Sequence, residues 1–226
     1  MTVGSPLEEW TGPVRDTPFV HPTKLSSEIY RGAVWSVRRD SVDFGVSVHN
    51  RDVLIHPGAV AVLAMDESDR VLLIRQYRHP VAMFLFEPPA GLLDIAGEPP
   101  ERTAARELAE ETGFLAGSWH TLVDLFNSPG GSSEAIRIYL ARDLSEIPGG
   151  RVPTGEAEES FLPRVWVPLD EAVTAVLSGD MGSPSAVCAV LAAAEARARN
   201  WTTLRPVDTP WPARENLVLH NRIHTP

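Results

Sequence analysis

Three glutamates crowd the end of a predicted helix. Glu107, Glu110 and Glu111 lie in the stretch ARELAEETGF, residues 105–114. On a helix they share one face, each like-charge pair costs roughly 0.2–0.5 kcal/mol, and the negative end of the helix dipole adds to that cost. Clustered carboxylates are tolerated around a hard divalent cation, and oxygen ligands favour Mg²⁺ or Mn²⁺. The alternative is a solvated acidic face in which Arg106 and Glu110 form an ordinary ion pair.

These acids need a helix held against a sheet, and the sequence predicts both. A helix is predicted over residues 99–112, because Pro99 and Pro100 suit its first turn and Gly113 suits a left-handed cap at its end. Strands mixed with helices indicate an α/β or α+β domain with a mixed sheet. A hairpin is expected between the strands at 59–65 and 70–77. The other expected strands lie at 82–91 (ended by a proline pair), 119–126, 135–144 and 164–169, and further helices at 171–179 and 185–199.

The chain divides into three predicted parts. Residues 1–56 comprise a Pro-rich arm and a small β-rich unit, 57–203 the main domain, and 204–226 a Pro-rich tail. A β unit of this size is too small to stand alone and must pack on something, so we expect it to support a homodimer.

Composition narrows the class of protein. The 226 residues include 20 basic and 30 acidic side chains, a net charge of −10, which disfavours nucleic acid as a partner. The longest apolar runs fall far short of a membrane span, and no secretory signal is visible. The single cysteine, Cys188, lies in an apolar helix-like run and is expected to be a buried thiol. We expect a cytoplasmic protein with no membrane or nucleic-acid partner.

The helix and the loop before it resemble a known family motif. Gly91, Glu98 and residues 106–114 (RELAEETGF) resemble the Nudix box, G-x5-E-x7-R-E-U-x-E-E-x-G-U, where U is a bulky apolar residue. One departure is a six-residue stretch between Gly91 and Glu98 where the family pattern has five. The resemblance implies an α/β/α sandwich with a mixed sheet, plus a small N-terminal antiparallel sheet. It also implies hydrolysis of a nucleoside diphosphate linked to another group.

The resemblance implies a role for each residue of the box. Glu107 and Glu111 would be metal ligands, with Glu110 close enough to bind metal or position water. Arg106 would orient the carboxylates, and the backbone carbonyl of Ala90 would be a further ligand. Divalent cations, Mg²⁺ or Mn²⁺, would neutralise the pyrophosphate and lower the pKa of an attacking water.

A second segment indicates the substrate. Residues 128–134 (SPGGSSE) resemble the segment that marks ADP-ribose pyrophosphatases, although alone they could be a plain turn between strands. The resemblance implies that Ser128 and Glu134 face the substrate. Arg78 matches an arginine that contacts pyrophosphate or ribose; without the motif it would be a surface charge.

The family resemblance also concerns the N-terminal unit. In similar proteins an N-terminal sheet is exchanged across a two-fold dimer and contributes to the partner's active site. That implies a homodimer in which Arg51 and Tyr30 reach the substrate in trans. The alternative for Tyr30 is a core or interface anchor.

An acidic loop at residues 155–160 (GEAEES) supplies candidates for the general base. Such loops are usually solvated. ADP-ribose pyrophosphatases, however, place a catalytic glutamate on a loop at this point, and Glu158 and Glu159 match it, with Glu158 preferred.

These residues predict hydrolysis of ADP-ribose to AMP and ribose 5-phosphate. One alternative is a Nudix hydrolase of another nucleoside diphosphate, a nucleotide sugar or an oxidised nucleotide. The other is a non-catalytic ADP-ribose-binding module, whose mark would be a damaged box. Because the acids of the box are intact, the enzyme is favoured.

If Glu158 is the general base, Glu158→Gln is expected to lower kcat roughly 10²–10⁴-fold with little change in KM, because only the proton acceptor is lost. Glu156→Gln, the matched control, is expected to leave kcat almost unchanged. Steady-state hydrolysis of ADP-ribose measures both. A large loss in Glu159→Gln instead would assign the base to Glu159. No loss in either would indicate a solvated loop and make Glu110 the leading base.

Overall fold

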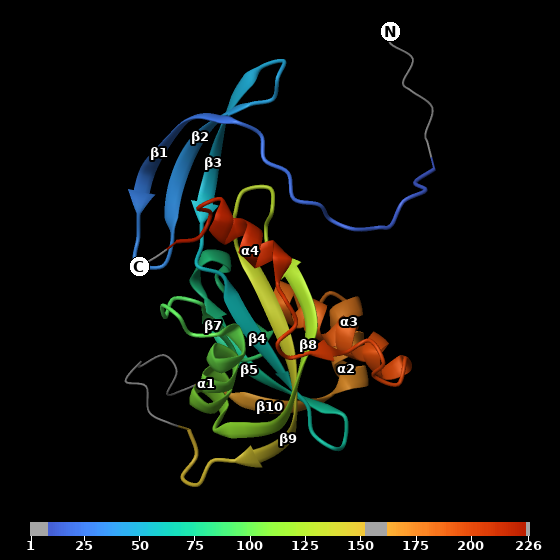
Figure 1. Ribbon diagram of the computed structural model, residues 1–226. Helices are drawn as coiled ribbons and strands as arrows, with labels where there is room; N and C mark the ends of the chain where they lie inside the picture. Colours follow the sequence, from blue (N-terminus) through green and yellow to red (C-terminus); the bar gives the residue numbers. More distant parts are fainter. Residues whose placement is uncertain (1–8, 152–161, 225–226) are drawn as a thin grey trace.

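The computed structural model describes residues 9–151 and 162–224 (Figure 1). No helix among these residues is long and apolar enough to cross a membrane. In chain order the strands are β1 (Thr23–Arg31), β2 (Ser36–Asp43), β3 (Val48–Ile55), β4 (Ala59–Ala64), β5 (Arg70–Arg78), β6 (Met83–Glu87), β7 (Ala90–Leu92), β8 (Phe114–Phe126), β9 (Ala135–Glu146), β10 (Arg164–Pro168) and β11 (Arg205–Pro206). The helices are α1 (Pro100–Thr112), α2 (Leu169–Leu177), α3 (Pro184–Ala198) and α4 (Pro212–Leu219), with a 3₁₀ turn at His79–Val81.

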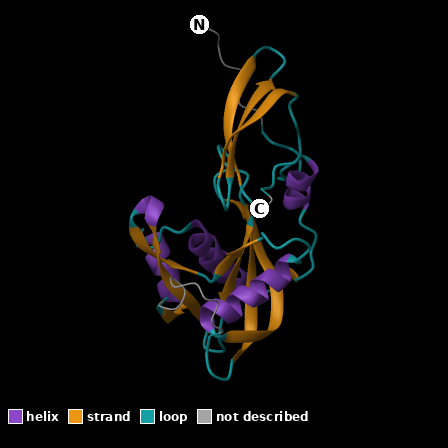
Figure 2. Ribbon diagram, turned by 90° about the vertical axis from the view of Figure 1, so that its left-hand side faces the viewer, coloured by secondary structure: helices purple, strands orange, loops and turns teal. Residues whose placement is uncertain are grey.

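The N-terminal β-rich unit is a three-stranded antiparallel sheet in the order β1-β2-β3, as the sequence predicts. It projects from one end of the molecule, with α4 near its base (Figures 1 and 2). Asp40 of β2 is 1% exposed and pairs with Arg38 and with Arg222, each at 3.0 Å. This buried carboxylate therefore fastens the end of the chain to the sheet.

The main domain is built on β4, which is buried along its whole length. Its alternate side chains face two different cores, because successive residues of a strand point to opposite faces. Ala61 and Leu63 pack with α2 and α3, whereas Val60 and Val62 pack with α1. Helices thus cover both faces of the sheet, and the predicted α/β/α sandwich is confirmed.

The sheet is mixed, as expected. It has five strands in the order β11-β8-β9-β4-β7, and only the β4–β9 pair is parallel. A second, antiparallel sheet has the order β10-β5-β6. The predicted DESD turn between β4 and β5 is present, because the Asp66 N–H donates to the Arg70 carbonyl and the Asp69 N–H to the Asp66 carbonyl. The two strands pair only at the bridge between Met65 and Val71, so the hairpin does not continue beyond it. Both edges of β4 are already taken by β7 and β9, so β5 diverges into the second sheet.

The C-terminal segment, predicted as a tail, is folded against the domain over the residues described. β11 pairs with β8, and α4 follows. Trp211 is 5% exposed and packs with the core beneath α1, together with Val207 and Leu217. The prolines in this segment interrupt regular structure, but its apolar side chains still supply part of the core.

Candidate active site

Helix α1 carries the glutamates, and its ends match the sequence prediction. Pro100 occupies the first turn, and Gly113 adopts a left-handed conformation (φ 75°) while its N–H donates to Ala109. Ala104 and Leu108 are fully buried in the core. Their burial fixes the rotation of the helix about its axis, and so fixes where the acidic face points.

Arg106 gathers three carboxylates around one guanidinium. Its Nη1 donates to Glu107 Oε1 at 2.8 Å and to Glu110 Oε2 at 2.9 Å, and its Nη2 lies 3.3 Å from Glu98 Oε2. Burial lowers the pKa of Arg106, but hydrogen bonds and charge from the carboxylates outweigh burial and raise it. At Glu98, burial raises the pKa, but hydrogen bonds from Arg106 and Thr103 lower it more. Arg106 and Glu98 therefore both stay charged.

Strand β7 forms a wall against the two buried glutamates of the helix. Glu107 is 8% and Glu111 4% exposed. A Cβ at Gly91 would lie 2.0 Å from Glu107 Oε1, so that position cannot carry a side chain unless Glu107 moves. Glu111 Oε2 accepts a hydrogen bond of 2.9 Å from the Ala90 N–H. The box glycine is thus needed because the helix and the strand approach so closely.

The extra residue between Gly91 and Glu98 does not disturb this arrangement. Gly91 contacts Glu107, and Glu98, which precedes α1, pairs with Arg106 on the helix. Thr103 Oγ1 also donates to Glu98 Oε2 at 2.8 Å. Both ends of the loop therefore meet at the same cluster, and the extra residue is absorbed between them.

The donor set fits a hard divalent cation in chemistry, because every candidate side-chain ligand is a carboxylate. Within residues 9–151 and 162–224, no three acidic, histidine or cysteine side chains are grouped closely enough to hold a metal ion. The glutamates of α1 have other partners, since Arg106 binds Glu107 and Glu110, and Glu111 accepts from the Ala90 N–H. Glu107 and Glu111 nevertheless both face β7, Glu107 at Gly91 and Glu111 at Ala90.

Arg78 forms an ion pair with Glu87, which precedes β7 in the sequence. Its Nε and Nη2 donate to Glu87 Oε2 at 2.8 and 2.7 Å. Glu87, 6% exposed, also accepts from Ser183 Oγ at 2.8 Å, and it ends β6 just before the segment that leads to β7. Sequence analysis missed Glu87; an acid that closes an apolar strand before two prolines was the available signal.

The loop with Ser128 and Glu134 is docked on the N-terminal sheet. The Ser128 carbonyl accepts from the N–H groups of Gly131 and Ser132, and the loop bonds to Leu54 of β3 on both sides. Glu134 accepts from Asn127 at 2.7 Å, and its other oxygen lies 3.8 Å from His56 Nε2.

His56, beside Glu134, has a lowered pKa. Burial is the main cause; His224 lowers the pKa further, and Glu134 partly opposes both. His56 Nδ1 also accepts a hydrogen bond from the Gly58 N–H. The imidazole is therefore kept neutral, and Glu134 is held between it and Asn127.

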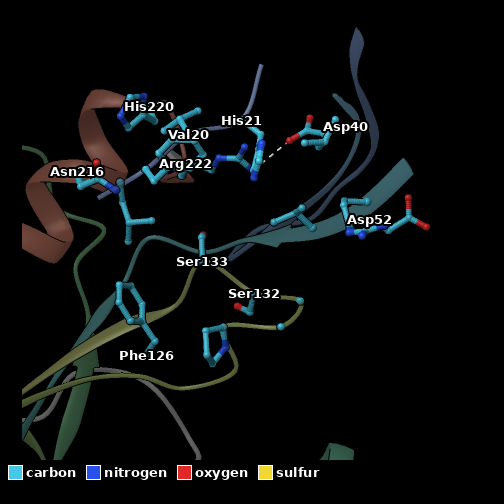
Figure 3. Close-up of a pocket in the computed structure, with 18 of the residues that line it drawn as sticks. Val20, His21, Asp40, Asp52, Phe126, Ser132, Ser133, Asn216, His220 and Arg222 are labelled. Atoms are coloured by element: carbon cyan, nitrogen blue, oxygen red, sulfur yellow. Dashed lines mark hydrogen bonds and ion pairs between the residues drawn. The ribbon is translucent and has the colours of Figure 1, made fainter. Parts of the chain in front are cut away.

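Arg51 lines a cavity of about 470 Å³ between the N-terminal sheet, the 129–133 loop and α4. Figure 3 shows Arg222 reaching toward Asp40 on one side, with Ser132, Ser133 and Phe126 on another. The Arg51 guanidinium lies 5.3 Å from the centre of the Phe44 ring. Tyr30 packs on Trp35, with ring centres 5.7 Å apart.

Apart from Arg78, which is paired with Glu87 at the ends of β5 and β6, the predicted residues that the structure describes fall into two groups. One surrounds α1 and β7, and the other surrounds the N-terminal sheet and its docked loop. Glu158 and Glu159 lie outside the described residues.

Comparisons with known proteins agree with the box. The model of the NUDIX domain matches residues 55–187. The chain is 44% identical over 189 residues to the ADP-ribose pyrophosphatase of Mycobacterium tuberculosis, covering 83% of this chain and 89% of that protein. It is 33% identical over 160 residues to the ADP-ribose pyrophosphatase of Bacillus subtilis, covering 70% and 84%. A solved structure described as an ADP compounds hydrolase has a TM-score of 0.68 at 23% identity, covers 82% of this chain and 98% of that one, and confirms the fold.

The close contact between Gly91 and Glu107 can be tested by substitution. Gly91→Ala is expected to displace Glu107 and to weaken Mn²⁺ binding about 10–100-fold, the usual cost of disturbing the surroundings of a metal ligand. Gly182→Ala, where a Cβ meets open space, is the control. Calorimetric titration with Mn²⁺ measures both. Equal affinities in the two variants would contradict the assignment of Glu107 as a ligand.

Proposed function

Because this chain belongs to the NUDIX family, we propose that it hydrolyses the pyrophosphate bond of ADP-ribose to AMP and ribose 5-phosphate. The observation that carries the proposal is the intact cluster of Glu98, Arg106, Glu107 and Glu110, with Glu111 held against β7. The two bacterial relatives, both named ADP-ribose pyrophosphatase, support the choice of substrate.

Nudix hydrolases generally need divalent metal ions, and we propose Mg²⁺ here. Glu107 and Glu111 would hold it, with Glu110 and the Ala90 carbonyl as further candidates. When bound, the cation supplies charge neutralisation at the pyrophosphate and a lowered pKa for water. Arg106 orients Glu107 and Glu110 by ion pairing.

Hydrolysis also needs a general base that removes a proton from the attacking water. Glu158, or its neighbour Glu159, is proposed to accept the proton of the attacking water. Glu110 is the alternative if neither does so.

Substrate contacts are proposed for Arg78, Ser128, Glu134 and Arg51. The pairing with buried Glu87 holds the Arg78 guanidinium in one place, and the side chain remains partly exposed for a phosphate or ribose oxygen. Glu134 is a carboxylate acceptor suited to ribose hydroxyl groups. Three of these residues lie beside the N-terminal sheet rather than beside α1, which is why a second copy of the chain enters the proposal.

We propose a homodimer in which the N-terminal sheet of one copy packs on the other. β1 is an edge strand and every one of its residues is exposed, including Leu25, Ile29 and Tyr30. Met83 and Phe84 of β6 are also exposed apolar residues. Exposed apolar edges are a liability unless covered, and a second copy would cover them. Arg51, on β3 of the same sheet, would then act in the partner's site.

The activity is tested with purified protein, Mg²⁺ and ADP-ribose, with AMP and ribose 5-phosphate measured by chromatography. A nucleotide sugar and an oxidised nucleoside triphosphate serve as rival substrates. Glu111→Gln is expected to remove most activity while metal-free stability stays equal or rises, because a ligand is lost and like-charge repulsion is relieved. Glu195→Gln, on the exposed face of α3, is the control. A Glu111→Gln variant with full turnover at saturating Mg²⁺ would contradict the assignment of Glu111 as a metal ligand. Faster turnover of a rival substrate would make that compound, rather than ADP-ribose, the proposed substrate.

The dimer is tested by analytical ultracentrifugation. Ile29→Lys is expected to shift the chain toward monomer and to lower hydrolysis, because it places a charge on the proposed interface. Leu177→Lys, at an equally apolar exposed position on α2, is expected to change neither. A wild-type chain that is monomeric at micromolar concentration and fully active would rule out a role for Arg51 in trans.

A further inference from the structure

A second cavity lies between the first turn of α1, strand β9 and the C-terminal segment. It encloses about 610 Å³, within the range of small-molecule pockets. Its apolar walls include Val207, Trp211, Val218 and Leu219. Pockets that bind small molecules are typically apolar with a few placed polar groups, and this cavity has three such groups.

Two of the polar groups are buried donors without acceptors. Tyr139 is fully buried and Trp211 is 5% exposed, and both line the cavity. Within the described residues, neither the Tyr139 O–H nor the Trp211 Nε1–H finds an acceptor, because Arg137, beside the Tyr139 hydroxyl, can only donate to it. Leaving such a group unsatisfied costs about 1–3 kcal/mol. Burial raises the pKa of Tyr139 to about 12, although nearby Arg137 opposes it, so the hydroxyl keeps its proton and can donate.

The third polar group is the guanidinium of Arg214. Burial lowers its pKa, and among the described residues no carboxylate is paired with it. Its Nη1 donates to the Pro57 carbonyl at 2.6 Å, and a Cβ at Gly58 would lie 2.6 Å from the same nitrogen, so the guanidinium is held in place. Arg137 differs, because it binds Asp124 through two nitrogens, at 2.7 and 3.0 Å.

The rings and cations lie close together. The guanidinium carbons of Arg137 and Arg214 lie 4.8 and 5.9 Å from the centre of the Trp211 ring. Tyr139 and Trp211 are donors without acceptors, and Arg214 is a cation without a carboxylate partner among the described residues, so the complementary ligand needs acceptor oxygens. Glu101, Asp208 and Glu215 also line the cavity, and their charges oppose a polyanion such as a pyrophosphate.

We propose that this cavity is a second ligand site, which takes a small molecule with a flat apolar body and a single carboxylate. The body lies among the apolar walls and Trp211, and the carboxylate accepts from Arg214 and from the buried donors. A planar carboxylate matches the fork of a guanidinium. Nothing in this assignment depends on hydrolysis of ADP-ribose.

The cavity is separate from the carboxylate cluster although both adjoin α1. Pro100 and Glu101 line the cavity from the first turn of the helix. Ala104 and Leu108 are buried in the same core as Tyr139 and Trp211, whereas Glu107 lies against Gly91 of β7. The two sites therefore meet different faces of one helix.

The test is calorimetric titration of the full chain with benzoate, 2-naphthoate and indole-3-carboxylate, and with 2-naphthalenemethanol as the uncharged control. We expect saturable binding of at least one carboxylate and at least tenfold weaker binding of the alcohol. Tyr139→Phe is expected to weaken carboxylate binding while the free protein melts at the same or a higher temperature, because the O–H that it removes is a buried donor without an acceptor. Arg214→Met is expected to weaken binding further.

Two controls separate this site from others. Glu111→Gln is expected to leave carboxylate binding unchanged, since that residue lies in the carboxylate cluster. Arg199→Met, on the exposed end of α3, should also leave it unchanged. Failure of all three carboxylates to bind would overturn the proposal, as would binding that Tyr139→Phe and Arg214→Met leave intact.

Discussion

Mutual repulsion among glutamates is the constraint on which the site depends. Glu98, Glu107 and Glu110 are held together because the Arg106 guanidinium lies among them. Without that cation, the acids would repel one another at the end of a helix whose dipole also disfavours them. One positive charge does not neutralise three negative ones, so the cluster keeps a net negative charge. A site of this kind is suited to divalent cations, and through them to a pyrophosphate.

Strand β4 gives this cluster its rigidity. β7, which supplies Ala90 and Gly91, pairs with β4 through Ala61 and Val60. Helix α1 packs on the same strand through Ala104 and Leu108. The helix and the glycine wall are therefore positioned by one fully buried element. This shared support explains how Glu107 can rest so close to Gly91 that a single methyl group would displace it.

The parts that sequence predicted are those specified by local signals. Helix α1 was predicted because Pro100 and Gly113 mark its ends, and its glutamates follow a family spacing. The partners of Glu87 and Trp211 depend instead on chain segments far apart in sequence: Ser183 reaches Glu87, and the C-terminal segment reaches the core beneath α1. The β4–β5 pairing failed for a related reason, since strand partners depend on which edges are already occupied. Local sequence patterns do not specify such long-range contacts.

The two sites that border α1 require ligands of opposite charge. At the carboxylate cluster, acids outnumber the one cation that binds them, so a ligand must bring positive charge. In the second cavity, the Tyr139 and Trp211 donors have no acceptor and Arg214 donates only to a backbone carbonyl, so a ligand must bring negative charge or lone pairs. Burial makes an unsatisfied donor costly. Since the same helix borders both sites, and Ala104 and Leu108 pack between them in the core, a ligand that fills the second cavity contacts the element that positions the carboxylates.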